Sequence, residues 1–557
     1  MKVVFYSSST NAYDGSSFHY TAYPACCSQL EKLAAAHPEH EFVVVARLPA
    51  FFLVDLENDG SFIRKARGVE YVMLDAAGLP VRAMLDKQAD AAFKACAPAS
   101  ASQASSAKKA LFADNAATAI SALSPDIAVA ATCWMTPFDW LPLEDALIAE
   151  KLEKAGIRTL CHSAASVELC FDKRETRAFL KAHRFPAPES VFLDHELYRA
   201  ERSHADVVIN PYKERMFTQL EKLHYPCVIK DTTGLSSFGM DVVNSPEAVR
   251  AVLDSRKMNG DRLIEEFVEG DQFGVEVYGT PGHYQVMTPF LFSVTRHGIT
   301  SPKQSVKLSV SGDEAETRFK LADMRRLVTD MAEALELRGA AQFDLVFSGA
   351  PGLESECGPS CEYGSWVVIE VNPRLSGLTV PTAVLAGKSA PDLLLVAGLE
   401  SVSVPSCENV LSDAAAPNES EMRCDGAASP ETSGVRCDGA ASPETRGVCF
   451  EGSQSRDKSG VRFEDRTAPA YVLDVKLIVL AGERFEELCA LPYVYAVNQT
   501  ANDDARQMRE RGYCEVVLGA ETPAVLLARL NDLKALFPDE LDDNFVESAR
   551  HLVLKAY

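Results

Sequence analysis

The chain has 557 residues, too many for one compact core and enough for about three or four domains of ordinary size. Hydrophobic residues make up 47% and charged residues 24%, which is typical of a globular protein and excludes disordered and fibrous classes. Acidic residues outnumber basic ones by 79 to 55, a net charge of −24. Because such a surface repels phosphate backbones and anionic lipids, we expect neither a nucleic acid nor a membrane as partner.

The sequence lacks the features of an exported protein. No stretch approaches about 18 consecutive apolar residues, and the apolar run near the N-terminus is too short for a signal peptide. The 15 cysteines therefore indicate reduced thiols, and we expect a cytoplasmic protein.

Residues 1–170 alternate short apolar strands with amphipathic helices such as Cys26–Ala36 and Leu143–Ala155. The predicted strands are Val3–Phe5, Phe42–Val45, Tyr71–Leu74, Ile127–Ala131 and Thr159–Cys161. Alternating strands and helices predict a Rossmann-like domain with a mostly parallel sheet covered on both faces. A G-x-G-x-x-G motif does not follow the first strand, so the pattern does not predict a dinucleotide site.

Residues 171–400 have a mixed α+β pattern. A helix over Lys173–Ala182 is followed by Phe185-Pro-Ala-Pro188, and a second strong helix is predicted over Lys320–Leu337. The predicted strands are Pro226–Lys230, Arg262–Phe267, Gly274–Tyr278, Ala341–Phe347 and Trp366–Val371.

The last two segments differ in composition. Residues 401–468 contain a tandem repeat of thirteen residues, RCDGAASPETSGV and RCDGAASPETRGV, whose Ser, Gly, Pro and Glu predict a solvated linker. Residues 469–557 regain a globular pattern and predict a small C-terminal α/β domain. Its expected elements are strands at Tyr471–Leu480 and Val516–Leu518 and a helix over Pro523–Phe537.

Two patterns indicate a nucleotide site. A buried strand ends at Lys230 and leads into a loop of small residues, and such loops let backbone N–H groups approach phosphate oxygens while a lysine adds charge. The loop residues expected to contribute are Gly234, Ser236, Ser237 and Gly239. The strand Leu263–Phe267 and its connector can present backbone groups to an adenine edge, with Glu265 accepting from the exocyclic amine. Each pattern alone is also compatible with an ordinary strand and loop.

A set of carboxylates carries the strongest signal. Glu370 and Asn372 are two residues apart on one strand and project from the same face, and a hairpin would place Asp344 of the neighbouring strand beside them. Carboxylate and amide oxygens are ligands of the kind that Mg²⁺ takes. Arg374 follows directly and would stabilise negative charge developing beside such a centre.

The order of these motifs along the chain resembles the motif order of the ATP-grasp superfamily. This superfamily includes biotin carboxylase, carbamoyl phosphate synthetase, D-alanine–D-alanine ligase and L-amino acid ligases. The resemblance covers about residues 170–400 and implies a lid over about 190–265, with ATP and Mg²⁺ or Mn²⁺ as cofactors. It implies that Lys173 and Lys230 contact the phosphates and that Glu266 and Val268 join Glu265 in the adenine hinge. Gln272 stands where many members have a ribose-binding glutamate. Asp344, Glu370 and Asn372 would hold the metal, and Arg374 would contact the phosphate or acylphosphate.

The family contains several chemistries, and the residues separate them in part. After Arg374 the chain reads Leu-Ser-Gly-Leu rather than the Arg-x-Gln-Val-Glu of biotin carboxylase, and it has no Met-Lys-Met biotinylation site. The resemblance therefore implies a ligase that activates a carboxylate as an acylphosphate for attack by an amine, with Lys307 as a further candidate catalytic residue. A bicarbonate-activating enzyme and a catalytically silent ATP-binding module remain as alternatives.

The partners implied are a small carboxylate and a small amine. We expect Thr379–Thr382 and the Ser7–Tyr13 loop to help form their pockets. The sequence leaves open the identity of both substrates, the pathway, the role of the repeat linker, and the oligomeric state, a homodimer included.

Overall fold

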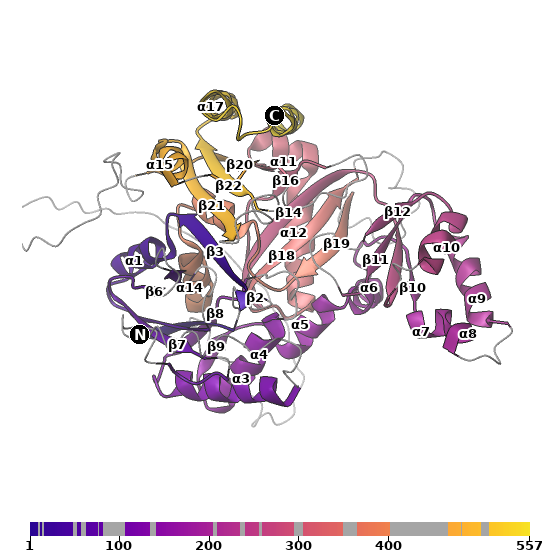
Figure 1. The fold of residues 1–557 in the computed structure, drawn as a ribbon, viewed down its shortest axis with the longest axis horizontal. Helices are drawn as coiled ribbons and strands as arrows, with labels where there is room; N and C mark the ends of the chain where they lie inside the picture. Colours follow the sequence, from indigo (N-terminus) through magenta and orange to yellow (C-terminus); the bar gives the residue numbers. More distant parts are fainter. Residues whose placement is uncertain are drawn as a thin grey trace, which may run out of the picture.

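The computed structural model describes residues 1–8, 12–13, 16–47, 53–56, 63–75, 77–81, 106–133, 141–203, 209–233, 240–255, 259–294, 305–348, 365–400, 466–480, 482–502 and 512–557. These residues form three larger sheets with helices packed on them (Figure 1). Most of the repeat-bearing linker predicted for 401–468 lies outside the described residues.

The N-terminal sheet is parallel throughout, with the strand order β7-β4-β1-β8-β9. Its strands are β1 (Lys2–Ser7), β4 (Glu41–Arg47), β7 (Val69–Leu74), β8 (Ile127–Ala130) and β9 (Arg158–Leu160). Helices α3 (Ser106–Ser121) and α4 (Leu141–Lys154) cover one face. Helices α1 (Cys26–Ala36) and α14 (Ala390–Glu400) cover the other, so a helix from far along the chain completes this domain. The predicted Rossmann-like layering is confirmed.

A four-stranded antiparallel sheet, β10-β13-β11-β12, forms the part that projects to the right in Figure 1. Its elements are β10 (Ser190–Leu193), α7 (His195–Tyr198), α8 (Ala200–Ser203), α9 (Pro211–Leu220), β11 (Cys227–Asp231), β12 (Asp241–Val243), α10 (Pro246–Asp254) and β13 (Arg262–Glu266). This part, here called the lid, has a small core of its own that includes Leu193, Ile229 and Ile264.

The largest sheet has eleven strands in the order β19-β18-β14-β16-β17-β20-β22-β21-β3-β2, with β15 paired to β14. Its strands are β2 (Ala12–Tyr13), β3 (Ser16–Tyr23), β14 (Asp271–Thr280), β15 (His283–Val286), β16 (Phe290–Phe292), β17 (Lys307–Ser309), β18 (Gly339–Phe347), β19 (Trp366–Asn372), β20 (Tyr471–Leu477), β21 (Val494–Asn502) and β22 (Cys514–Ala520). Because β17 pairs with β20, the sheet runs across the boundary predicted at residue 469.

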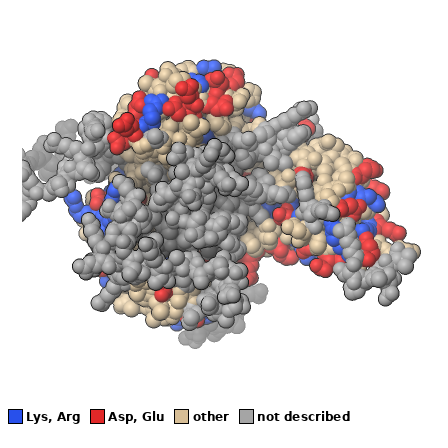
Figure 2. All heavy atoms as spheres, viewed as in Figure 1, with Lys and Arg blue, Asp and Glu red and all other residues tan. Residues whose placement is uncertain are grey.

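Helices close the remaining surfaces of this sheet. They are α5 (Ala164–Phe171), α6 (Lys173–Ala182), α11 (Asp313–Phe319), α12 (Leu321–Ala334), α13 (Thr379–Leu385), α15 (Gly482–Ala490), α17 (Pro523–Leu536) and α18 (Asp543–Ala556). A short pair, β5 (Asp55–Leu56) and β6 (Ile63–Arg64), stands apart. In Figure 2, acidic side chains predominate over the C-terminal helices, and both signs of charge occur on the lid.

Most predicted elements occur within a few residues of their expected ends, and the helices at Cys26–Ala36 and Lys173–Ala182 have the predicted bounds. Two details differ. Lys320 takes a left-handed conformation with φ of 52° between α11 and α12, so the helix predicted from 320 to 337 is shorter. Thr379–Thr382, predicted as a loop, forms the first turn of α13.

Candidate active site

The strand pair β18–β19 brings the predicted metal ligands together. In this antiparallel pair Asp344 lies opposite Glu370 and Gln342 lies opposite Asn372, with an irregularity in register directly after Asp344. The Asn372 side-chain amide donates to Asp344 Oδ2 over 3.4 Å, and Gln342 Nε2 donates to Asp344 Oδ1 over 2.7 Å. The predicted hairpin geometry is confirmed.

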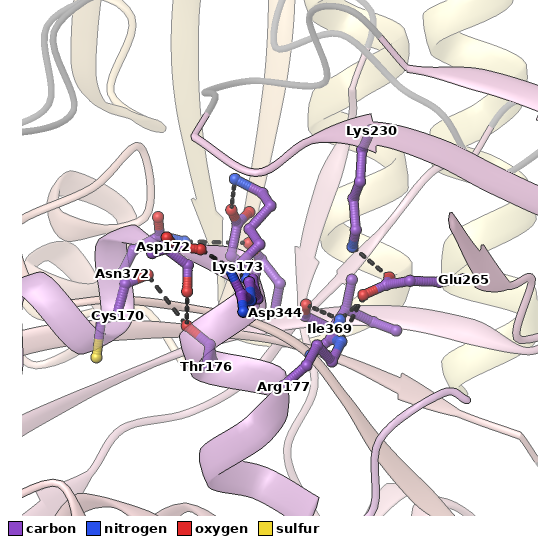
Figure 3. Close-up of polar contacts among 12 residues, drawn as sticks. Cys170, Asp172, Lys173, Thr176, Arg177, Lys230, Glu265, Asp344, Ile369 and Asn372 are labelled. Carbon is purple, nitrogen blue, oxygen red and sulfur yellow. Dashed lines mark hydrogen bonds and ion pairs between the residues drawn. The ribbon is translucent and has the colours of Figure 1, made fainter. Parts of the chain in front are cut away.

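Lys173 faces this acidic pair from the N-terminus of α6. Asp172 caps that helix by accepting from the backbone N–H of Arg174 over 2.8 Å, and Lys173 begins the first turn. Lys173 Nζ lies 2.8 Å from Glu370 Oε1. Figure 3 shows Lys173 and Asp344 side by side, with Lys230 and Glu265 farther along the same site.

The two carboxylates have opposite pKa shifts. Burial, and then the charge of Glu370, raise the pKa of Asp344 to about 7. Burial also acts to raise the pKa of Glu370, but Lys173, Lys230 and Arg374 lower it below its ordinary value. Two partly buried acids, one of which resists ionisation because the other is charged, form a site where a divalent cation relieves the repulsion. The donor set therefore fits Mg²⁺ or Mn²⁺.

Lys230 is held by a buried ion pair at the base of the lid. Its ammonium contacts Glu265, and the exposed fractions of the two residues are 5% and 3%. Arg177 of α6 binds the same carboxylate, with Nη2 donating to Glu265 Oε2 over 3.2 Å and to the Ile369 carbonyl over 2.6 Å. Burial lowers the pKa of Lys230, and the charge of Glu265 opposes that effect.

This ion pair bears on the expected role of Glu265. Both of its oxygens are engaged by Arg177 and Lys230, because buried cations need a counter-charge, and its predicted contact with an adenine amine stays a prediction. The neighbouring Glu266 accepts from the His224 backbone N–H over 2.8 Å. Val268 follows the end of β13 and is half-buried.

The other predicted nucleotide residues are placed only in part. Gln272 lies on β14 opposite Val346. Gly234, Ser236, Ser237 and Gly239 lie outside the described residues.

Arg374 is buried at the end of β19, with 6% of its surface exposed. Its Nη2 donates to Asn372 Oδ1 over 3.0 Å, so the arginine and the predicted metal ligand are in direct contact. The side-chain oxygen of Asn372 therefore points toward Arg374, and turning the amide over would present it to Asp344 instead.

Residues 375–379, here called the 375–379 loop, are held by the N-terminal domain and by two strands of the large sheet. The Leu375 N–H donates to the Thr132 carbonyl of the N-terminal domain over 3.0 Å. Glu276 of β14 accepts from the hydroxyls of Ser376 and Thr379 over 2.7 and 2.6 Å. Lys307 Nζ donates to the Gly377 carbonyl over 3.0 Å.

Lys307 belongs to a buried charge cluster formed by Lys307, Asp474, Lys476 and Glu515. Its Nζ lies 2.7 Å from Asp474 Oδ2 and 3.1 Å from Glu515 Oε1, and Lys476 Nζ lies 2.6 Å from each of the same two acids. Lys307, predicted as a candidate catalytic residue, is thus held between the Gly377 carbonyl and two acids of β20 and β22.

Sequence reasoning missed Arg177, Glu276 and the acids that bind Lys307. Two of them carried a readable signal. Arg177 lies four residues after Lys173 on the same helix face, and Glu276 is a charged residue inside an otherwise apolar strand.

Comparisons with known proteins agree with this geometry. The sequence profile of the ATP-grasp domain matches residues 170–378. A D-alanine–D-alanine ligase of Clostridium botulinum is 26% identical over 137 residues, which are 24% of this chain and 40% of that protein. The corresponding ligase of Francisella philomiragia is 22% identical over 204 residues, 37% of this chain and 61% of that protein. The alignments thus span 40% and 61% of these two curated relatives, in each case less than two thirds.

A solved structure matches over nearly the whole chain. The L-amino acid ligase of Bacillus licheniformis superposes with a TM-score of 0.52 at 15% identity, covering 96% of this chain and 97% of that one, which shows a shared fold.

Within the described ranges, no single helix is long and apolar enough to cross a membrane, whereas α13 and α14 pass that test together but are bent by 76°. The profile match identifies residues 170–378 as an ATP-grasp domain, and the whole chain shares its fold with a solved L-amino acid ligase.

Proposed function

We propose that the chain is an ATP- and Mg²⁺-dependent ligase that joins a carboxylate to an amine, with amino acids as the substrate class. The observation that carries this proposal is the facing pair Asp344 and Glu370, with Lys173 Nζ 2.8 Å from Glu370 and Arg374 bonded to Asn372 beside them. Anionic metal ligands, a phosphate-binding cation and a buried guanidinium thus share one site.

Lys173 and Lys230 are the groups proposed to bind the phosphates of ATP. Each is paired with an acid, Glu370 and Glu265 respectively, so each ammonium group is oriented before the nucleotide arrives. The end of β13, with Glu266 and Val268, supplies backbone groups for the adenine. Support for this hinge is that residues 267–270 join β13 of the lid directly to β14 of the large sheet.

Asp344, Glu370 and Asn372 would hold Mg²⁺, which supplies charge neutralisation at the β- and γ-phosphates when bound. Lys173 would then exchange its contact with Glu370 for a phosphate oxygen.

The reaction would proceed in two displacements. A substrate carboxylate oxygen attacks the γ-phosphorus, the bond to the β-phosphate oxygen breaks, and ADP and an acylphosphate form. The amine then attacks the acyl carbon, the C–O bond breaks, and an amide and inorganic phosphate form while the amine loses a proton. Arg374 stabilises the negative oxygens in both steps, and lid closure excludes water from the acylphosphate.

A turnover assay tests the proposal. ADP release is measured with ATP, Mg²⁺ and amino acids supplied singly and in pairs, with Glu370→Gln as the matched variant that keeps the side-chain shape. We expect pair-dependent release that Glu370→Gln lowers by at least about 100-fold, the scale of losing a charge-stabilising group.

Added hydroxylamine should trap the activated carboxylate as a hydroxamate. Release that depends on bicarbonate instead of an amine would favour a carboxylase, and nucleotide binding without release under every condition would indicate a silent module. Either result would overturn the ligase proposal.

A further inference from the structure

A turn between α1 and β4 brings together three side chains that can bind a metal ion. Its sequence is His37-Pro38-Glu39-His40, and one ligand atom from each histidine and from the glutamate lies within 4.8 Å of the other two. His37 Nδ1 lies 3.8 Å and His40 Nε2 lies 3.5 Å from Glu39 Oε1. Ligands of a tetrahedral zinc ion at about 2.0–2.1 Å stand about 3.3 Å apart, so a small side-chain movement would complete the geometry.

The two imidazoles are packed against the protein, whereas the glutamate side chain is exposed. The His40 N–H donates to the His37 carbonyl over 3.0 Å, which closes the turn, and the His40 ring packs with its edge toward Phe42. The side chains of His37 and His40 are 23% and 10% exposed, and that of Glu39 is 61% exposed. The turn thus holds two partly buried imidazoles close together, with an exposed carboxylate beside them.

A fourth residue orients the first histidine. Asp392, in the first turn of α14, lies with its Oδ1 3.1 Å from His37 Nε2. When Nε2–H donates to this carboxylate, Nδ1 carries the lone pair and faces Glu39. A carboxylate behind an imidazole is the usual arrangement at histidine metal sites, where it fixes the tautomer and strengthens the ligand.

We propose that His37, Glu39 and His40 bind a divalent transition metal ion of the zinc class, with Asp392 as the residue that positions His37. Two imidazole nitrogens and one carboxylate suit Zn²⁺, Co²⁺ or Ni²⁺, whereas Mg²⁺ requires oxygen ligands. The site therefore differs in chemistry from the oxygen-lined pair Asp344 and Glu370. Three protein ligands leave a position for water.

The ion would connect two parts of the chain that are distant in sequence. Its ligands precede β4 of the N-terminal sheet, and Asp392 belongs to α14, which covers that sheet directly after the ATP-grasp domain. A bound ion would strengthen this junction, so binding should raise the melting temperature of the full chain.

The test is a titration of the full chain with Co²⁺, followed by visible absorption, in excess Mg²⁺ that occupies the oxygen-lined site. We expect one equivalent to bind with nitrogen and oxygen ligation, to be displaced by Zn²⁺, and to raise the melting temperature. His37→Ala and His40→Ala should each weaken binding by at least about 10-fold, and Asp392→Asn by about 10- to 100-fold.

The matched control is His195→Ala. His195 also lies 3.8 Å from a neighbouring glutamate, Glu196, but its segment His-Glu-Leu-Tyr has a single histidine. This variant should bind Co²⁺ like the unchanged chain, and metal-free melting curves of all variants establish that each is folded.

Three results would overturn the proposal. The first is failure of the unchanged chain to bind Co²⁺. The second is an affinity of His37→Ala and His40→Ala for Co²⁺ equal to that of the unchanged chain. The third is a thiolate-to-cobalt absorption band, which would assign the metal to cysteines instead.

Discussion

Arg177 is a buried cation whose partners come from separate elements, Glu265 of β13 and the Ile369 carbonyl of β19. Removing the Arg177 guanidinium leaves Lys230 as the remaining cation beside the buried Glu265. It also removes the side-chain donor to the Ile369 carbonyl. We therefore expect Arg177→Met to lower the free energy of unfolding by about 3–5 kcal/mol, measured by urea denaturation at neutral pH.

Lys181→Met on the same helix is the control for this substitution. Lys181 lies 3.4 Å from Glu189, but the side chains are 78% and 66% exposed, so solvent screens the pair. We expect a loss of about 1 kcal/mol or less. Equal losses in both variants would show that burial does not set the contribution of these ion pairs.

Asp145 gives a pH-dependent test at a single residue. It is fully buried on α4, its Oδ1 accepts from the Ser8 N–H over 2.8 Å, and burial raises its pKa to about 8. An unfolded aspartate has a pKa near about 3.9, so between these values the folded chain binds more protons than the unfolded chain. The contribution of Asp145 to stability is therefore fully present below about pH 3.9, falls as the pH rises above that value, and is lost by about pH 8.

Asp145→Asn removes this titration and keeps the acceptor oxygen for Ser8. We expect the variant to melt at a higher temperature than the unchanged chain at pH about 9 and at nearly the same temperature at pH about 3, below the pKa of an unfolded aspartate. A difference of the same size at both values would contradict the assignment.

At the scale of elements, the 375–379 loop depends on Lys307. The Lys307 ammonium donates to the Gly377 carbonyl and forms ion pairs with Asp474 and Glu515. Because the loop directly follows Arg374, we expect Lys307→Met to lower kcat of the proposed ligase by about 10- to 100-fold, the cost of misplacing a catalytic group. ATP affinity, measured by calorimetry, should change little.

The same substitution leaves two buried acids with one cation, so a loss of stability must be separated from a loss of positioning. The double variant Lys307→Met with Asp474→Asn restores the charge balance of the cluster. It should recover stability in urea but not kcat. Recovery of both would reduce Lys307 to a structural role.

The sequence predicts those parts of the site that depend on residue spacing within one strand or on the pairing of neighbouring strands. Glu370 and Asn372 are two residues apart on one strand, so their shared face follows from strand geometry alone, and Asp344 required only a hairpin between neighbouring strands. Lys307 is different, because its partners Asp474 and Glu515 are more than 150 residues away and no periodicity connects them. Spacing can predict a hairpin but cannot predict which distant strand lies behind a loop.

At the scale of the whole molecule, the same limit applies to domain boundaries. A change of composition near residue 400 predicts a separate C-terminal domain, but β20 pairs with β17, and the core of β14 and β18 continues into β20 and β22. Phe273, Phe343, Val475 and Val516 share that core. The lid, in contrast, has its own smaller core.

These cores predict how the full chain opens. Hydrogen exchange of the intact protein should protect β14, β18, β20 and β22 with similar free energies, because opening any one of them exposes the shared core. The lid strands β11 and β13 should exchange at a lower free energy, since fewer buried side chains hold them.

ATP with Mg²⁺ should raise the protection of the lid more than that of the large sheet, because the proposed nucleotide contacts join the lid to it. Earlier exchange of β20 and β22 than of β14 and β18 would show that the C-terminal strands open independently, as the composition alone suggests.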